Sequence, residues 1–215
     1  FYTGIFFWMF KLPKYTILHH ILLGVYLGPL SGVFGLLVGL IARRCSPATG
    51  LFSAPFIWVC LEYVRSNLFF LSLPWGLLAH SQYQNPILIQ MASITGVFGI
   101  GFLIVLVNSA LTIFVWPLLS RLSLAIPSST EPLLSRGAKA LVGTAAVCFA
   151  INLIYGYTIA SQTISGAKYR VSVVQANIEQ SKKWEKEYAA MIMDTYDELT
   201  RKASRDKPAL IVWPE

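Results

Sequence analysis

The chain of 215 residues is 55% hydrophobic and only 13% charged, whereas soluble domains carry about 25% charged residues, so an ordinary soluble domain is excluded. The formal net charge is +7, but residues 168–215 hold nine basic and eight acidic side chains and contribute only +1 of it. A nucleic-acid-binding protein would need a basic face with interleaved aromatic residues on its soluble surface, so no nucleic-acid partner is expected.

The N-terminal part of the chain contains apolar runs that are suited to a bilayer. Residues 1–10 are interpreted as a partial span, because they are apolar and the chain begins without an initiator Met. Residues 21–42 contain no charged side chain, and about 20 apolar residues are enough to cross the hydrocarbon core. Arg43 and Arg44 follow directly and mark the end of this first full span.

Three further spans are predicted, at 51–65, 87–119 and 140–160. The first of these carries Glu62 and Arg65, which are three residues apart and therefore share a helical face. Charges inside a membrane are costly unless they are paired or functional, so the two residues form either a structural ion pair or a lipid-headgroup site. The run 87–119 is longer than one span requires, so it must tilt, kink or begin in the interface.

Basic residues indicate which loops face the cytoplasm. The loops 43–49 and 120–139 together hold five Lys or Arg residues, whereas the loop 66–86 holds none. Cytoplasmic loops are enriched in basic residues. The loop 66–86 and everything after residue 161 are therefore expected on the outer side.

Residues 165–215 are predicted to begin a soluble α/β domain that follows a membrane domain at 1–164. The segment 169–178 is rich in β-branched residues, which is typical of a strand. The segment 185–203 has the apolar periodicity of an amphipathic helix, and 209–213 is predicted to be a short, fully buried strand. Strand, helix and strand with short connections imply a parallel pair.

Glu215 follows this second strand directly after Pro214. Functional groups gather at the carboxyl ends of parallel strands. Partial desolvation beside Trp213 would raise the pKa of a carboxylate at this position towards that of a general base. Glu215 is therefore a candidate catalytic residue, with an ordinary solvated loop glutamate as the alternative.

Four segments resemble the apolipoprotein N-acyltransferases, which are membrane-embedded members of the nitrilase superfamily. They are VSVVQANIEQSKKW (171–184), LIVWPE (210–215), EYVRSNLFFLSLPWGLLAHSQYQ (62–84) and QMASITGVFGIGFLIVLVNSAL (90–111). The WPE motif alone is shared by the wider nitrilase family, and the Pro-Trp loop in a multi-span domain makes the resemblance more specific. The resemblance implies a polytopic α-helical membrane bundle followed by the start of an α/β nitrilase-like domain, an αββα sandwich.

The resemblance also implies an activity and its requirements. An acyl chain would pass from a phospholipid to the N-terminal amine of the diacylglyceryl-cysteine of a lipoprotein, through a thioester formed by a Glu-Lys-Cys triad. Glu215 matches the glutamate of that triad. The lysine and the cysteine lie after the WPE motif in the family, so the chain is expected to be a fragment truncated at both ends and inactive by itself. No cofactor and no metal are implied, and the location is the bacterial inner membrane with the nitrilase-like domain in the periplasm.

Two tryptophans are candidate substrate-binding residues. Trp184 matches a tryptophan of the family's substrate region, and Trp75 follows Pro74 in the outward loop. Tryptophan is also enriched in the headgroup layer, so each residue is alternatively an interfacial anchor.

Two other interpretations stay open. A related membrane enzyme would acylate another amine or hydrolyse an amide. A transporter or membrane scaffold would need unpaired polar groups in mid-span or a broken helix pair, whereas the spans contain mainly Gly and Ser as small or polar residues. The cysteines at 45, 60 and 148 show neither a disulfide framework nor a metal-binding spacing, and we expect them to be small buried hydrophobic residues.

Overall fold

The computed structural model of the chain describes residues 2–12, 14–122, 135–162, 165–179 and 181–214, without the side chains of 117–122. The chain forms two compact units, Phe1–Gln162 and Thr163–Glu215.

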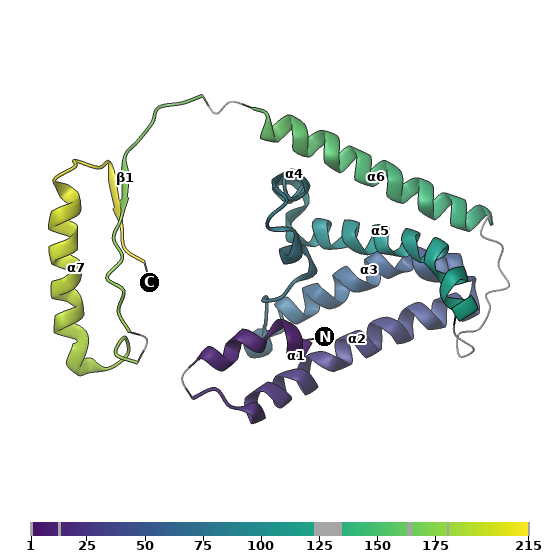
Figure 1. Cartoon of the computed structure of the whole chain (residues 1–215), viewed down its shortest axis with the longest axis horizontal. Helices are drawn as coiled ribbons and strands as arrows, with labels where there is room; N and C mark the ends of the chain where they lie inside the picture. Colours follow the sequence, from purple (N-terminus) through teal and green to yellow (C-terminus); the bar gives the residue numbers. More distant parts are fainter. Residues whose placement is uncertain (1, 13, 123–134, 163–164, 180, 215) are drawn as a thin grey trace. The chain divides into compact units, whose positions relative to one another are not determined.

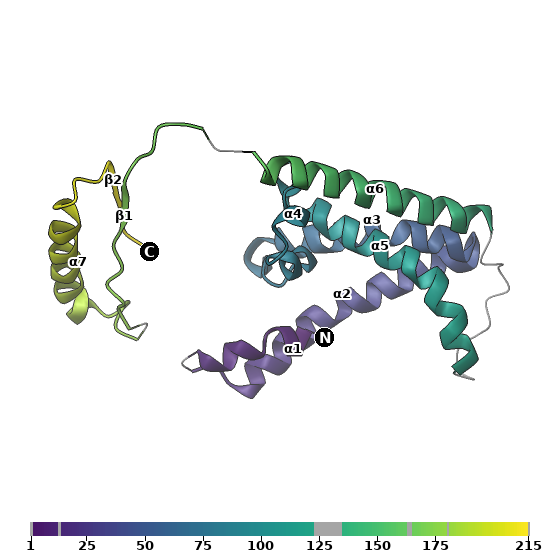
Figure 2. The same cartoon turned by 45° about the horizontal axis from the view of Figure 1, so that its top comes forward.

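The first unit is built from helices (Figure 1). In chain order they are α1 (Tyr2–Ile5), the 3₁₀ helix η1 (Phe7–Lys11), α2 (Ile17–Arg44), α3 (Pro47–Ser66), the 3₁₀ helices η2 (Phe69–Leu71) and η3 (Leu78–Gln82), α4 (Pro86–Ile89), α5 (Ala92–Leu122) and α6 (Arg136–Ala160). Helix α3 packs between α2 and α5, and α6 packs along α5 and against α4 (Figure 2).

Serine caps determine where two of the long helices begin. The Ser46 side chain accepts a hydrogen bond from the Thr49 amide at 3.2 Å, and Pro47 occupies the first turn of α3. The Ser135 side chain accepts a hydrogen bond from the Ala138 amide at 3.1 Å at the start of α6. Both caps satisfy amides that lack a partner within the helix.

Within the described residues, three helices are long and apolar enough to cross a membrane: Ile17–Arg44, Ala92–Trp116 and Arg136–Ala160. They contain most of the spans predicted at 21–42, 87–119 and 140–160. The chain therefore has a mostly helical portion with the character of a membrane domain.

Two of the predicted spans differ in the structure. The span predicted at 51–65 forms α3, a helix of 20 residues, but α3 is not among the three helices with sufficient length and hydropathy. Glu62 and Arg65 lower its hydropathy. The partial span predicted at 1–10 forms the short elements α1 and η1 instead of one continuous helix.

Helix α5 begins with a break at Gly96. This residue has φ +65° and ψ −172°, a conformation that glycine adopts at little cost because it has no Cβ. The run predicted at 87–119 is thus divided into α4, a turn and a kinked helix. The structure confirms that this long run is not one straight span.

Apolar side chains close the interface between α5 and α6. Leu106 and Ala110 of α5 pack against Leu141 and Ala145 of α6, and all four are buried. A second cluster joins Tyr2, Phe6 and Leu27, which fixes the N-terminal elements onto α2.

The short helix α4 approaches α6 closely at Gly156. A Cβ at this position would overlap the backbone carbonyl of Ile87. One turn earlier on the same face of α6, the Asn152 Nδ2 donates a hydrogen bond to the Leu88 carbonyl at 3.4 Å. Small residues let membrane helices approach, and Gly156 does so here.

Replacing Gly156 with Ala is expected to destabilise the first unit by about 1–3 kcal/mol, because the new methyl group must displace the backbone of α4. Gly143→Ala is the matched control, since nothing lies within 4 Å of a Cβ at that position of the same helix. The control should leave stability unchanged or raise it slightly, because alanine favours helix. Melting temperatures of the detergent-solubilised protein measure both effects, and equal values for the two variants would contradict the close approach.

The second unit contains β1 (Val171–Val173), the 3₁₀ helix η4 (Lys186–Tyr188), α7 (Ala189–Ser204) and β2 (Leu210–Val212). The strands pair in parallel with Val171 opposite Leu210, which confirms the predicted strand–helix–strand arrangement. Both strands are shorter than predicted, and the sheet of the described residues has two strands.

Two burial predictions are wrong. The second strand is not fully buried, because Leu210 is 55% exposed and Val212 is 39% exposed. Among the described elements, this strand contacts β1 and α7. Cys45 and Cys60 are also exposed. Cys148 is half-buried and packs against the apolar cluster between α5 and α6.

Candidate functional site

The predicted catalytic residue Glu215 lies outside the described residues. The chain that leads to it is described as far as Pro214. The described residues that bear on the candidate site are those that hold the chain before Glu215, together with the two candidate tryptophans.

Trp213 follows β2 and packs on helix α7. Its indole Nε1 donates a hydrogen bond to the Thr200 hydroxyl oxygen at 2.9 Å. Its ring stacks on Tyr196, with 4.9 Å between the ring centroids and an angle of 23° between the planes. Tyr196 and Thr200 are four residues apart and thus lie on the same face of α7.

Backbone hydrogen bonds at both ends of β2 fix its register against β1. The Val174 amide donates to the Val212 carbonyl at 2.9 Å, and the Ala209 amide donates to the Arg170 carbonyl at 2.8 Å. Arg170 also donates from Nη1 to the Asp206 carbonyl at 2.8 Å, which holds the turn that precedes the strand. The strand therefore reaches Trp213 in a defined register.

Trp184 lies in the segment between β1 and η4. Its side chain is 75% exposed, and the Lys183 ammonium lies 5.5 Å from the centre of the ring. Earlier in the segment, a hydrogen bond from Ser181 and the Lys182 ammonium at 3.2 Å lower the pKa of Glu179. The exposed indole is compatible with either substrate contact or anchoring in a headgroup layer.

Trp75 lies in the loop between η2 and η3 of the first unit and is 51% exposed. Its ring packs on that of Trp8 at 5.9 Å between the centroids. Its backbone carbonyl accepts a hydrogen bond from Arg65 Nη1 at 2.8 Å. Tyr26 of α2 holds the same loop by donating to the Leu71 carbonyl at 2.6 Å.

Glu62 and Arg65 form a buried pair beneath this loop, with 5% and 2% exposure. Arg65 Nη2 lies 3.9 Å from Glu62 Oε1, whereas the same carboxylate oxygen accepts the Leu78 amide at only 2.8 Å. Each charged group thus bonds more closely to the loop than to its partner. We call the pair, with its bonds to Trp75 and Leu78, the loop clamp.

The loop clamp favours one of the two interpretations of this pair. A side chain that is 2% exposed and already donates to a carbonyl has little surface to offer a lipid headgroup. The structural ion pair is therefore the better interpretation. The spacing of three residues predicted the pair, but nothing in the sequence indicated Trp75 and Leu78 as its partners.

The candidate residues belong to different parts of the chain. Trp75 belongs to the first unit, Trp184 belongs to the second, and Glu215 lies outside the described residues. The structure describes how each tryptophan is held and how the chain before Glu215 is held.

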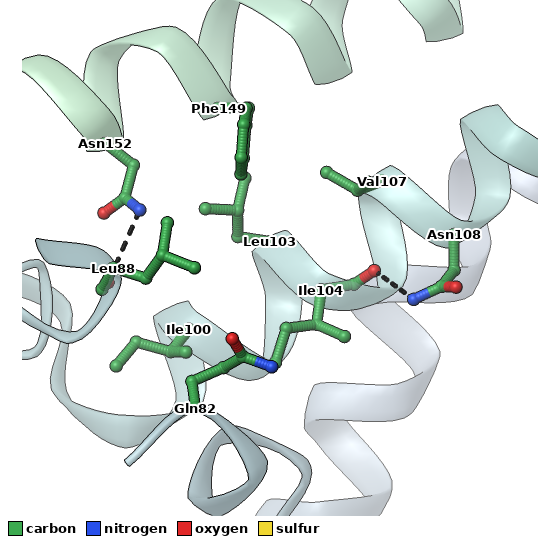
Figure 3. A pocket seen from close by; sticks show the side chains of 9 residues that line it. All are labelled: Gln82, Leu88, Ile100, Leu103, Ile104, Val107, Asn108, Phe149 and Asn152. Atoms are coloured by element: carbon green, nitrogen blue, oxygen red, sulfur yellow. Dashed lines mark hydrogen bonds between the residues drawn. The ribbon is translucent and has the colours of Figure 1, made fainter. Parts of the chain in front are cut away.

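Sequence reasoning missed a pocket of about 190 Å³ in the first unit (Figure 3). Five of its lining residues come from α5, and the others come from η3, α4 and α6: Gln82, Leu88, Ile100, Leu103, Ile104, Val107, Asn108, Phe149 and Asn152. Three amides give it polar positions, but it has no titratable side chain. The pocket can hold an aliphatic group and offers no acid–base chemistry. The sequence feature that could have indicated this pocket is the presence of amide residues, Asn108 and Asn152, within apolar runs.

Among the described residues, no three His, Cys, Asp or Glu side chains lie close enough together to hold a metal ion.

Comparison with known proteins gives a match to one family model over the N-terminal half of the chain. Residues 1–110 match the model described as the apolipoprotein N-acyltransferase N-terminal domain. This range includes α2, α3, the loop clamp and the first part of α5.

Curated relatives extend the similarity towards the C-terminus. A protein named apolipoprotein N-acyltransferase from Geobacter metallireducens is 34% identical over 166 residues, which cover 77% of this chain and 30% of that protein. Proteins with the same name from Allorhizobium ampelinum and Coxiella burnetii are 30% and 28% identical, over 72% and 80% of this chain and 26% and 32% of their own lengths. The chain thus spans less than a third of the length of these three relatives.

Proposed function

Because the chain belongs to the apolipoprotein N-acyltransferase family, we propose that it is part of a membrane enzyme that transfers an acyl chain from a phospholipid to the N-terminal amine of a lipoprotein. The match of residues 1–110 to the family model is the observation that carries this proposal. Three apolar helices of spanning length support a membrane location.

The proposed reaction has two steps. Glu215 takes the proton of a cysteine thiol, and the thiolate attacks an ester carbonyl of the phospholipid. The ester bond breaks, a lysophospholipid leaves with a hydroxyl group, and the acyl chain stays on the enzyme as a thioester. The amine of diacylglyceryl-cysteine then attacks the thioester, an amide forms, and the thiol is restored. A lysine stabilises the negative oxygen that develops in each step.

Each candidate residue of this chain has a proposed role. Glu215 is the general base. The resemblance places the thiol and the lysine after the WPE motif, so the activity is proposed for the full-length protein. Trp184 and Trp75 contact lipid substrate through exposed indole rings, which combine an apolar body with a polar N–H group. The proposed fold of residues 165–215 is the start of a nitrilase-like αββα sandwich, for which the parallel β1–β2 pair is a consistent beginning.

The proposed location is the bacterial inner membrane, with the second unit in the periplasm. The five basic residues in the loops 43–49 and 120–139 support this orientation, because basic loops are retained on the cytoplasmic side. No metal or cofactor takes part in the proposed chemistry.

An acyl-transfer assay tests the proposal with the full-length protein in detergent micelles. We expect a labelled acyl chain to move from a phospholipid to a synthetic diacylglyceryl-cysteine peptide, detected by mass spectrometry as an N-acylated product. A peptide whose N-terminus is already acetylated is the control and should gain no label. Release of the label only as free fatty acid, or transfer to the acetylated control, would contradict the proposal.

A further inference from the structure

Two residues of α7, Tyr196 and Thr200, contact Trp213, which lies two positions before Glu215 in the sequence. We propose that Thr200 and Tyr196 are positioning residues: by fixing Trp213, they restrain the backbone that leads into Glu215 and so favour proton transfer to it. The inference rests on the proposed role of Glu215 as the general base. The apolar periodicity predicted for the helix did not single out either residue.

The contacts of Trp213 restrain both the position and the rotation of its indole. The hydrogen bond to Thr200 at 2.9 Å fixes the N–H edge of the ring. The stacking on Tyr196, at 4.9 Å and 23°, fixes its face. Because the two partners lie one helical turn apart on α7, the indole is held at two points along a rigid element.

Pro214 limits the conformations of the chain between Trp213 and Glu215. Pro214 separates Trp213 from Glu215, and the proline ring fixes its own φ at about −65°. The residue before a proline is restricted to extended conformations. Few backbone torsions therefore remain free between the fixed indole and the residue that follows Pro214.

Strand pairing alone gives a weaker restraint. Each strand has three residues, and a ladder of two strands is only marginally stable by itself. At the end of β2, the Val212 carbonyl accepts a hydrogen bond from the Val174 amide. The contacts of Trp213 with α7 therefore hold the chain one residue beyond this hydrogen bond.

Small displacements of a general base have large effects on rate. A base must lie within about 2.6–3.2 Å of the proton that it removes, and a displacement of 1 Å lowers a rate by up to about 10²-fold. Loss of one of the two contacts should therefore slow the proton-transfer step without changing how the lipid binds.

Thr200→Val in the full-length enzyme tests the inference, because valine has the shape of threonine but cannot accept the indole hydrogen bond. Acyl-enzyme formation is measured from labelled phospholipid in the absence of the acceptor peptide. We expect the rate constant at saturating phospholipid to fall about tenfold, with an unchanged half-saturating phospholipid concentration. Thr200→Ser, which keeps the hydroxyl group, should restore most of the rate.

Thr195→Val is the matched control on the same helix. The Thr195 hydroxyl donates to the Met191 carbonyl of its own helix, so its loss changes α7 without changing the hold on Trp213. Tyr196→Leu removes the stacked ring and should slow acyl-enzyme formation, and Tyr196→Phe, which keeps the ring, should restore most of the rate.

Three results would overturn the inference: a wild-type rate in Thr200→Val, an equal loss in Thr195→Val, or a loss that appears only in the half-saturating concentration. Failure of the proposed function gives a different result. In that case the wild-type protein itself forms no thioester.

Discussion

Glu215→Gln in the full-length protein is expected to lower the rate of acyl-enzyme formation by about 10²–10⁴-fold, which is the usual contribution of a general base. Glutamine keeps the size and hydrogen-bonding shape of the side chain but cannot accept the thiol proton. The thiol would then stay mostly protonated at neutral pH, because the unperturbed pKa of cysteine is about 8.5. Mass spectrometry of the intact protein after incubation with phospholipid measures the thioester.

Glu198→Gln is the control for this substitution. Glu198 is an exposed residue on α7, two positions from both Tyr196 and Thr200 and therefore on another face of the helix, so the same chemical change is made in the same unit without altering the residues that contact Trp213. The control should form the thioester at the wild-type rate. Full thioester formation in Glu215→Gln would remove Glu215 from the role of base, and a comparable loss in both variants would point to the stability of the unit instead.

Breaking the loop clamp should produce the largest loss of stability in the first unit. Glu62→Leu leaves the Arg65 guanidinium buried without a carboxylate and leaves the Leu78 amide without its acceptor. Removing one partner of a buried pair costs about 3–5 kcal/mol. Glu62→Gln should cost less, because its amide oxygen still accepts the Leu78 N–H. Unfolding of the solubilised protein by added sodium dodecyl sulfate measures the three stabilities.

A double-mutant cycle separates the pair from its individual residues. Glu62→Leu combined with Arg65→Met removes both charges, so no buried charge is left uncompensated. The double variant should be less destabilised than the sum of the two single variants, since contacting residues are not additive. Additive losses would show that Glu62 and Arg65 act independently, each through its own bond to the loop.

The sequence predicted elements best where one physical signal dominates. Uncharged runs of about 20 residues gave the spans at 21–42 and 140–160, because in such runs hydrophobicity alone decides the outcome. The segment 51–65 was harder, since Glu62 and Arg65 reduce the apolar signal and their partners lie in a loop. The parallel strand pair was predicted from β-branched runs around a periodic helix, but burial of the second strand was not.

Contacts with backbone groups explain most of what the sequence did not predict. Any residue has a carbonyl and an amide, so no residue type signals that Trp75 accepts from Arg65 or that Leu78 donates to Glu62. The sequence likewise gives no indication of the close approach of Gly156 to Ile87. The contact of Trp213 with Thr200 joins residues 13 positions apart, and it depends on how β2 docks on the helix.

The partners of the loop clamp also bear on how the protein is assembled. Glu62 and Arg65 lie near the end of α3, and the groups that pair with them, at Leu78 and Trp75, are synthesised later. Until those residues emerge, Glu62 and Arg65 have each other but lack their closer partners in the loop, and the hydropathy of α3 is below that of the three helices suited to spanning. Charged side chains oppose transfer into lipid. Integration of α3 into the bilayer is therefore expected to be completed only when the following loop and α5 arrive, as one cooperative step of biogenesis.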